Sequence, residues 1–305
     1  MSNLAGTLQA THCIDNPCTA IERMISPTEK NLGDFTVMRL LPFIEHRMVG
    51  PWIFFDHAGP AVFDSGKGLD VRPHPHICLA TVTYLFEGKL LHRDSMGNTQ
   101  IIKPGDINLM VAGSGIVHSE RTPPELRKAS HTLHALQLWL ALPMKDEEMD
   151  PDFFHYPAKL LPTTNIENVS IRVMMGSAYG LTSPVKTFSQ TLYVEAHLQA
   201  GQSITVPEAK ERAVYVVSGQ LNAKGSTIPK HHMAVFSQEE SIVLYAEEET
   251  QIAIIGGDPL GERFIEWNFV SSSKERIEHA KQDWKLNRFA TIPDDHEEFI
   301  PLPDN

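Results

Sequence analysis

The sequence predicts an all-β protein that folds as two consecutive antiparallel β-barrels and ends in one short helix and a tail. Short segments rich in β-branched and aromatic residues recur at regular intervals, and glycine- or proline-containing turns separate them, which is typical of sandwiches and barrels. The second half of the chain repeats the strand pattern of the first. With 305 residues, the chain is long enough for two domains that each have a core.

The first half is organised around residues 72–120, where strands and turns alternate. Glu87-Gly88 and Pro104-Gly105-Asp106 have the composition of tight turns between these strands. Before this stretch, Gly59-Pro60 is expected to end a strand and to lead into a loop over residues 61–69. The expected strands cover residues 35–41, 51–57, 81–86, 90–94, 107–112, 116–120 and 134–140.

The second half begins after residues 143–152 (PMKDEEMDPD), which are acidic, flanked by proline and typical of a linker. We therefore expect an N-terminal domain over residues 1–143 and a C-terminal domain over residues 144–305. A helix is expected over residues 273–288, where Ser273 can cap the first turn, and an extended tail follows Pro293. The expected strands cover residues 170–175, 190–195, 203–206, 213–217, 233–236, 241–245 and 250–255.

Bulk composition excludes some classes of protein. The formal net charge of −12 argues against direct, sequence-independent nucleic-acid binding. Three cysteines, Cys13, Cys18 and Cys78, give no disulfide framework and suit a reducing compartment, and the first two are interpreted as ordinary residues. We find neither a secretory signal pattern nor an apolar run of membrane-spanning length. We expect a cytoplasmic monomer without a membrane or direct nucleic-acid partner.

Two pairs of metal-capable side chains lie at the ends of the central stretch. His74 and His76 are two residues apart, as are His118 and Glu120, and residues i and i+2 of a strand face the same side. Three imidazoles and one carboxylate that converge inside a barrel suit Fe, Mn, Ni, Cu or Zn, and the lack of a thiolate argues against a closed structural zinc site. Four ligands on an octahedral ion leave two positions for other molecules.

Each of these residues can also have a purely structural role that requires no metal, and we weigh that role against metal binding for each. One histidine pair in a strand is more often structural than metal-binding, but two pairs separated by a turn-rich stretch favour a metal. His92 and Asp94 are interpreted as a hydrogen-bonding set. Cys78 follows His76 by two residues and would share its face by alternation, and we interpret it as a core cysteine.

The two halves also differ in their ligands. Aligning Gly219 with Gly88 places Thr205 and Pro207 at the positions of His74 and His76. Counting on from the later turn places the apolar pair Val243-Leu244 near the position of His118. The second half is therefore expected to repeat the architecture without the ligands, so that the protein holds one metal ion.

Taken together, these motifs resemble the pirin family of the cupin superfamily. The resemblance covers roughly residues 50–290. It rests on His74-Pro75-His76, residues 80–88 (ATVTYLFEG), His92-Arg93-Asp94-Ser95, Pro104-Gly105-Asp106, residues 112–120 (AGSGIVHSE), residues 134–139 (HALQLW), residues 257–262 (GDPLGE) and the expected helix over residues 274–289.

The resemblance implies two cupin domains and one metal ion, usually iron, in the first. The family's ligands map onto His74, His76, His118 and Glu120. Some pirins open the ring of flavonols such as quercetin with O₂, and Glu120 is the ligand that could take the proton of the 3-hydroxyl group. The alternative is a non-enzymatic regulator that binds a protein partner in response to the redox state of the metal.

The sequence departs from the commoner pirin pattern near the ligands. Residues 77–80 read Ile-Cys-Leu-Ala where many members have Arg-Gly-Phe-Glu, Ser114 replaces a usual Arg, and Leu109 replaces a common Trp. The ligands are intact, so we expect these departures, Cys78, Ala80 and Ser114 above all, to bear on the choice of substrate or partner.

Overall fold

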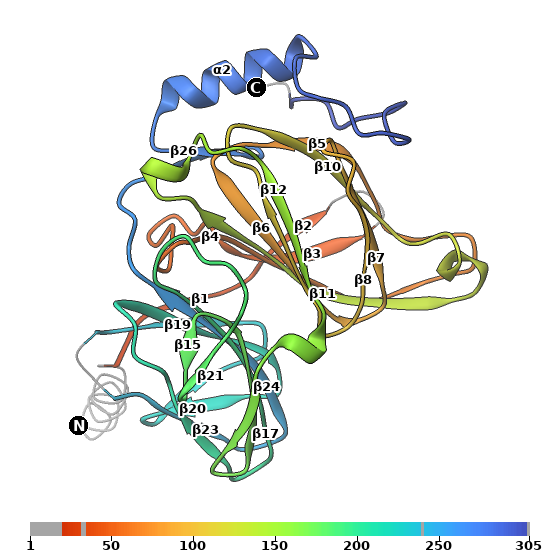
Figure 1. The fold of residues 1–305 in the computed structure, drawn as a ribbon. Helices are drawn as coiled ribbons and strands as arrows, with labels where there is room; N and C mark the ends of the chain where they lie inside the picture. Colours follow the sequence, from red (N-terminus) through yellow and green to blue (C-terminus); the bar gives the residue numbers. More distant parts are fainter. Residues whose placement is uncertain (1–19, 32–34, 239–240, 304–305) are drawn as a thin grey trace, which may run out of the picture. The chain divides into compact units, whose positions relative to one another are not determined.

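The computed structural model describes residues 20–31, 35–238 and 241–303, and consists mainly of β-strands (Figure 1). The all-β class is confirmed, and every strand expected from the sequence is present. Among the described residues, no helix is long and apolar enough to cross a membrane. Cys13 and Cys18 lie outside the described residues.

The described residues divide into two compact units, which we call the N-terminal barrel (residues 29–31, 35–42, 51–160 and 260–303) and the C-terminal barrel (residues 20–28, 43–50, 161–238 and 241–259). Each is built from a seven-stranded and a four-stranded antiparallel sheet. In the N-terminal barrel the large sheet runs β12 (Asp152–Tyr156), β9 (Ile107–Val111), β6 (Leu79–Glu87), β11 (His131–Ala141), β4 (Trp52–Phe63), β3 (Thr36–Leu41) and β2 (Thr28–Asn31), and the small sheet runs β5 (Asp70–His76), β10 (Ile116–Arg121), β7 (Leu90–Asp94) and β8 (Thr99–Ile102).

The C-terminal barrel repeats this strand order, as the sequence predicts. Its large sheet runs β1 (Ile21–Ile25), β22 (Met233–Phe236), β19 (Glu211–Ser218), β24 (Thr250–Gly257), β17 (Thr191–Leu198), β14 (Val169–Met175) and β13 (Thr163–Ile166). Its small sheet runs β18 (Ser203–Thr205), β23 (Val243–Ala246), β20 (Leu221–Ala223) and β21 (Ser226–Ile228), and β15 (Ser177–Ala178) with β16 (Leu181–Thr182) forms a hairpin.

The two units are interleaved along the chain and differ from the expected division at residue 143. β12 follows the expected linker but pairs with β9 of the N-terminal barrel, and β1 pairs with β22 of the C-terminal barrel. The acidic linker residue Glu147 is itself buried, where its carboxylate accepts hydrogen bonds from Ser271 and Ser272 and lies 2.9 Å from Arg263 Nε. Pairing supplies a partner for a sheet edge, so these edge strands belong to the unit whose sheet they complete.

One expected turn is absent. β4 continues through Gly59-Pro60 as far as Phe63, because β11 pairs with it on both sides of this dipeptide. The pairing shifts register between Leu133 and Ala135, and such a bulge accommodates a proline that cannot donate a hydrogen bond. The loop is therefore shorter than residues 61–69.

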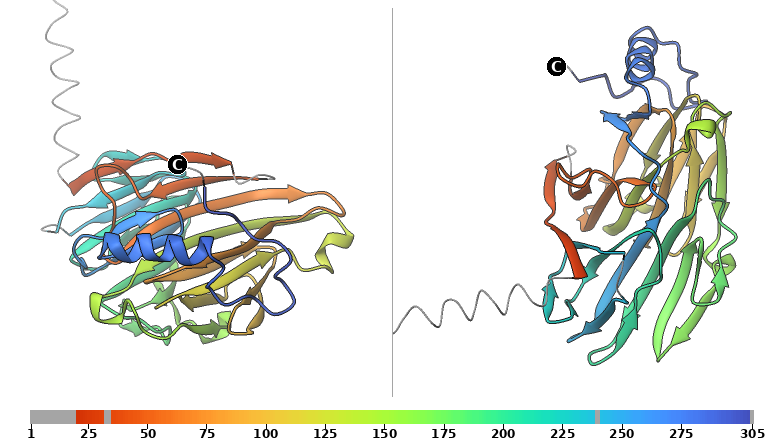
Figure 2. Two further views of the ribbon diagram at one scale, coloured as in Figure 1. Left: turned by 90° about the horizontal axis from the view of Figure 1, so that it is seen from above. Right: turned by 90° about the vertical axis from the view of Figure 1, so that its left-hand side faces the viewer.

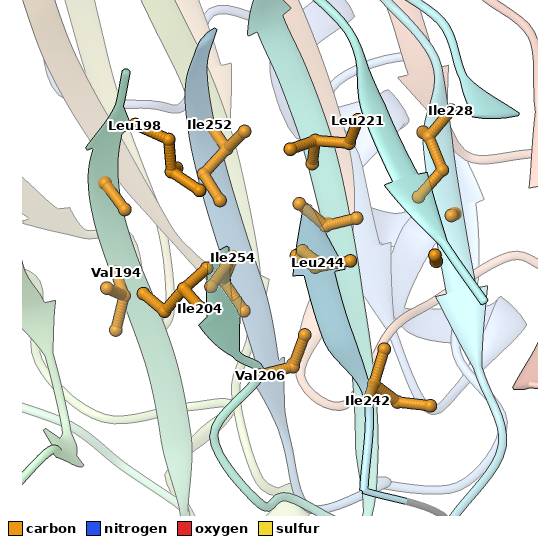
Figure 3. Close-up of a cluster of buried hydrophobic side chains, with 14 of the residues drawn as sticks. Val194, Leu198, Ile204, Val206, Leu221, Ile228, Ile242, Leu244, Ile252 and Ile254 are labelled. Carbon is orange, nitrogen blue, oxygen red and sulfur yellow. The ribbon is translucent and has the colours of Figure 1, made fainter. Parts of the chain in front are cut away.

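The interior of the C-terminal barrel is filled with aliphatic side chains, including Val194, Ile204, Leu221, Leu244 and Ile252 (Figure 3). Ile204 lies opposite Leu244 across β18 and β23, the strands that correspond to β5 and β10.

The inward positions of this half hold aliphatic side chains, and the glycine alignment is wrong by one residue. Thr205 is exposed and lies opposite Val243 on the outer face, so Ile204, Val206 and Leu244 are the inward counterparts of the histidines. Because strand side chains alternate, a slip of one residue exchanges the two faces.

The C-terminal helix, α2 (Lys274–Lys285), starts at the expected cap, where Ser273 Oγ accepts a hydrogen bond from Arg276 N. Its Ile277 and Ala280 pack with Ile77 and with Phe269 of β26 (Phe269–Ser271), which pairs with β25 (Phe264–Glu266). In Figures 1 and 2 the helix and the tail (blue) lie at the end of the N-terminal barrel formed by β5, β10 and β26. The tail is attached there, since Ile300 N donates to Pro73 O and Arg121 binds Asp295.

Candidate metal centre

Three histidines converge inside the N-terminal barrel. β5 carries His74 and His76, and β10 places His118 directly opposite His74. One ring nitrogen from each lies within 4.8 Å of the others, and the ring centroids are 4.4 to 5.0 Å apart. All three side chains are buried. The alternation inferred from the sequence therefore brings these residues together.

Hydrogen bonds orient the rings with one nitrogen toward the centre. His74 Nδ1 lies 2.8 Å from the carbonyl oxygen of Arg72, and His76 Nδ1 lies 2.9 Å from that of Asn268, so each Nδ1–H donates and each Nε2 keeps its lone pair. His118 Nε2 is buried without a hydrogen-bond partner. A buried, unpartnered imidazole nitrogen beside two others fits a metal ligand.

Burial keeps these imidazoles neutral. Burial lowers the pKa of His74 to about 4, and burial together with the neighbouring histidines lowers the pKa of His76 and His118 well below the ordinary value. Near neutral pH the lone pairs are therefore free for a metal ion.

His92 and Asp94 support the third histidine. His92 Nδ1 lies 3.5 Å from His118 Nδ1, and His92 Nε2 lies 3.2 Å from Asp94 Oδ2. Asp94 in turn accepts hydrogen bonds from the backbone of the turn at Met96 and Asn98. The hydrogen-bonding set expected from the sequence is confirmed, and its contact with His118 favours a proton on His118 Nδ1, which leaves Nε2 for a metal.

Glu120 lies beside the three histidines rather than within their cluster. It follows a register shift in β10 and lines the same cavity. Its Oε1 is 3.2 Å from Thr83 Oγ1. Burial raises the pKa of Glu120, while His92 and the hydrogen bond from Thr83 act in the opposite direction.

The cluster opens into a cavity of about 490 Å³. On one side the cavity is lined by β5 and β10 with the histidines, and on the other by β3, β4 and β11 of the large sheet. Trp267, Asn268 and Ile300, from the segments that surround α2, complete the lining. This volume is in the range that accommodates a small organic molecule.

Sequence reasoning missed several polar residues of this cavity. Arg39 and Asp56 form an ion pair in its wall, and Gln137 and Asn268 also line it. Asp56 had a visible signal, since it is an acidic residue that directly follows the apolar run 51–55 within one expected strand. Asn268 had no such signal, because it contacts His76 through its backbone carbonyl group, which the pairing of β25 with β26 places near β5.

The departures from the family pattern do not line the cavity. Cys78 has φ +57° and packs with Phe269 and Ile277, so the core assignment is confirmed and the shared face with His76 is wrong. Glycine adopts such a φ without strain, which explains why many pirins have it there. Ala80 and Leu109 belong to the face of the sheet opposite Thr83, and Ser114 is exposed in a turn.

Within the part of the chain that the structure describes, the three histidines are the only group of three potential ligands. The corresponding positions of the C-terminal barrel hold aliphatic side chains.

Comparisons with known proteins agree with this architecture. The pirin family model matches residues 34–140, and the model of the pirin C-terminal cupin domain matches residues 193–290. A pirin-like protein of Caulobacter vibrioides is 48% identical over 93% of this chain and 100% of its own length. A Pseudomonas aeruginosa protein, provisionally named quercetin 2,3-dioxygenase PA1205, is 36% identical over 87% of this chain and 84% of its own.

A solved structure is similar throughout. The crystal structure of a quercetin 2,3-dioxygenase from Acinetobacter baumannii has 32% sequence identity and a TM-score of 0.86, with 93% of this chain and 95% of that chain covered. The two barrels with a shared strand order, the cluster of three histidines and these matches agree with one another. The chain belongs to the pirin family and is a two-domain cupin protein.

Proposed function

We propose that this protein is a metal-dependent quercetin 2,3-dioxygenase, which opens the ring of a flavonol with O₂. The observation that carries the proposal is the cluster of three neutral, buried imidazoles at the wall of a cavity of about 490 Å³. The names of the Pseudomonas and Acinetobacter relatives support the same activity. A regulator that only senses the state of its metal would not need a cavity of this size.

We assign His74, His76, His118 and Glu120 as ligands of one divalent transition metal. Fe(II) is preferred because the family usually holds iron, and Mn, Ni, Cu and Zn are the alternatives for a nitrogen and oxygen ligand set. A bound ion would act as a Lewis acid that lowers the pKa of a flavonol hydroxyl group and would bring the anion close to O₂.

The protein's own residues would move one proton. Glu120 is the candidate base for the 3-hydroxyl group of the flavonol. In the metal-free protein burial raises its pKa, and Thr83 donates a hydrogen bond to its Oε1. In the same cavity, Trp139 and Phe54 stack with ring centroids 3.9 Å apart, and the Trp139 ring lies 4.9 Å from that of His76, so the two give the cavity an aromatic surface.

Loading the purified protein separately with Fe, Mn, Ni and Cu and incubating it with quercetin under air tests the activity. We expect the flavonol absorbance to fall with at least one metal, and faster than with the metal-free protein. Absence of turnover with all four would contradict the proposal and would favour the alternative, a metal-dependent regulator that binds a protein partner.

Three variants test the roles of the ligands. His74→Ala and His118→Ala are expected to lose stoichiometric metal, and retention of metal would remove the assignment. Glu120→Gln is expected to keep part of the metal and to lose turnover, because an amide cannot accept the proton. Full activity of Glu120→Gln would show that another group is the base.

A further inference from the structure

Four polar side chains form a line across the large sheet behind the metal cavity, and three of them, Arg39, Asp56 and Gln137, line the cavity itself. Arg39 on β3 lies opposite Asp56 on β4, Asp56 lies opposite Gln137 on β11, and Gln137 lies opposite Thr83 on β6. Residues directly opposite in neighbouring strands share a face, so all four belong to the inner face of the sheet. We call them the polar row. Three strand spacings give it a length of about 14 Å.

The polar row begins at the metal centre and ends near the surface. Thr83 Oγ1 is 3.2 Å from Glu120 Oε1 and 2.9 Å from Gln137 Oε1. With the Gln137 amide turned over, its NH₂ group donates to Thr83 and Thr83 donates to Glu120. At the other end, Arg39 is partly exposed. A ligand that lies along the row would therefore have one end at Glu120.

Arg39 and Asp56 form a bidentate ion pair, with Nε and Nη2 each 2.8 Å from a carboxylate oxygen. Asp56 is only 4% exposed. Buried ion pairs stabilise a fold less than apolar residues of similar size, so such a pair in a cavity wall calls for another explanation. A carboxylate has about four lone-pair sites, and the guanidinium group occupies two, which leaves acceptor positions for a hydroxyl group in the cavity.

Apolar layers border the polar row along the strands. On one side Phe54 and Trp139 stack at an interplanar angle of 12°, and on the other Val37, Ala58 and Ala135 lie opposite one another in register. A flat aromatic ligand that packs on this wall can therefore find hydrogen-bond partners for its hydroxyl groups only along the polar row. Because the ion pair is neutral overall, it favours hydroxyl groups over a carboxylate.

We propose that the polar row is the specificity-determining wall of the cavity and that it selects aromatic ligands with hydroxyl groups remote from the metal-binding oxygens. Asp56 accepts a hydrogen bond from such a hydroxyl group, and Gln137 provides a second polar contact. A ligand without these groups would cover the polar row and leave its acceptors unpaired, which weakens binding. The inference rests on the proposed function and narrows its substrate class to hydroxylated flavonols.

Binding to the Zn(II)-loaded protein separates recognition from turnover, because Zn(II) has no redox chemistry. The probes are quercetin and 3-hydroxyflavone, which share the metal-binding hydroxyketone and differ in their remaining hydroxyl groups. We expect calorimetry on the wild type to give at least about tenfold tighter binding of quercetin. Equal affinities would overturn the proposal, and so would the failure of both flavonols to bind.

The variant Arg39→Met/Asp56→Leu removes both partners of the pair and is expected to lose most of the preference while it still binds 3-hydroxyflavone. The matched control is Arg172→Met/Glu195→Leu, since that pair joins the corresponding strands β14 and β17 of the other barrel. Its side chains are 29% and 7% exposed, against 27% and 6% for Arg39 and Asp56. The control is expected to keep the preference.

The outcomes distinguish this inference from the proposed activity. A preference that survives in Arg39→Met/Asp56→Leu would overturn the role of the row, and Asp56→Asn provides the same test if the double variant does not fold. If binding depends on the hydroxyl groups but none of the Fe, Mn, Ni and Cu forms consumes quercetin, the dioxygenase proposal fails and the role of the polar row in binding stands. Turnover of quercetin without tighter binding of quercetin than of 3-hydroxyflavone would support the dioxygenase proposal and overturn the role of the polar row.

Discussion

Acidifying the metal-free protein from about pH 7 to about pH 4 is expected to lower its free energy of unfolding through the buried histidines. His74 has a pKa of about 4 in the folded state, whereas an exposed imidazole in the unfolded chain has a pKa near 6.5. Between these values the unfolded state binds more protons, so stability falls as the pH falls. The difference in pKa corresponds to about 3 kcal/mol for His74 alone.

Other groups oppose this trend, so the measurement has to be differential. Burial raises the pKa of Asp56 and Glu120, so these carboxyl groups bind protons first in the folded state and add stability as the pH falls. Comparing the wild type with His74→Gln in urea unfolding after chelator treatment isolates the histidine. Between about pH 7 and about pH 4, we expect the free energy of unfolding of the wild type to fall by about 2 to 3 kcal/mol more than that of the variant.

Two outcomes bear directly on the reasoning. Parallel pH curves for the wild type and His74→Gln would refute the claim that burial keeps His74 neutral. Adding Zn(II) at neutral pH should raise the stability of the wild type, since the ion binds only the folded site, and this gain should disappear on acidification as protons compete for the imidazoles.

Three further predictions follow from contacts in the two barrels. Thr83→Val should lower kcat about tenfold because it removes the hydrogen bond to Glu120, and Thr83→Ser should restore it; equal kcat values for the Val and Ser variants would exclude a positioning role. Asp295→Ala should speed proteolysis of residues 287–303, because Asp295 binds Arg121 through two hydrogen bonds of 2.8 and 2.9 Å; an unchanged cleavage rate would show that other contacts hold the tail. Ile204→Ala should cost about 2 to 5 kcal/mol in urea unfolding and leave the metal content unchanged; loss of metal would contradict a site confined to the N-terminal barrel.

Local patterns in the sequence predicted the strands and the metal cluster. The i, i+2 spacing of His74 and His76 suffices to place both side chains on one face, and the cap at Ser273 suffices to start the helix. Both depend on residues near in sequence. The contact between β5 and β10, which adds His118, followed from the barrel fold itself.

What the sequence did not predict depends on distant pairing or on single backbone angles. The pairing of β12 with β9 and of β1 with β22 involves edge strands whose partners are set by the rest of each sheet. Cys78, just after β5, departs from the alternation of that strand because its φ is positive. A residue type other than glycine gives no sign of a positive φ in the sequence. Arg39 and Asp56 are far apart in sequence and are joined only by the register of β3 and β4.

The interiors of the two barrels have the same strand framework but different contents. In the C-terminal barrel, Ile204 and Leu244 fill the positions of His74 and His118 and belong to one large aliphatic cluster. In the N-terminal barrel, the cavity, the histidines and the ion pair of the polar row replace that packing, and each of these features lowers stability relative to a filled apolar core. The apolar packing of Ile277 and Ala280 of α2 against Ile77 and Phe269, outside this interior, offsets part of the cost. α2 and the segments next to it thus add apolar packing at the end of the barrel that holds the cavity, whereas the C-terminal barrel obtains such packing from its filled interior.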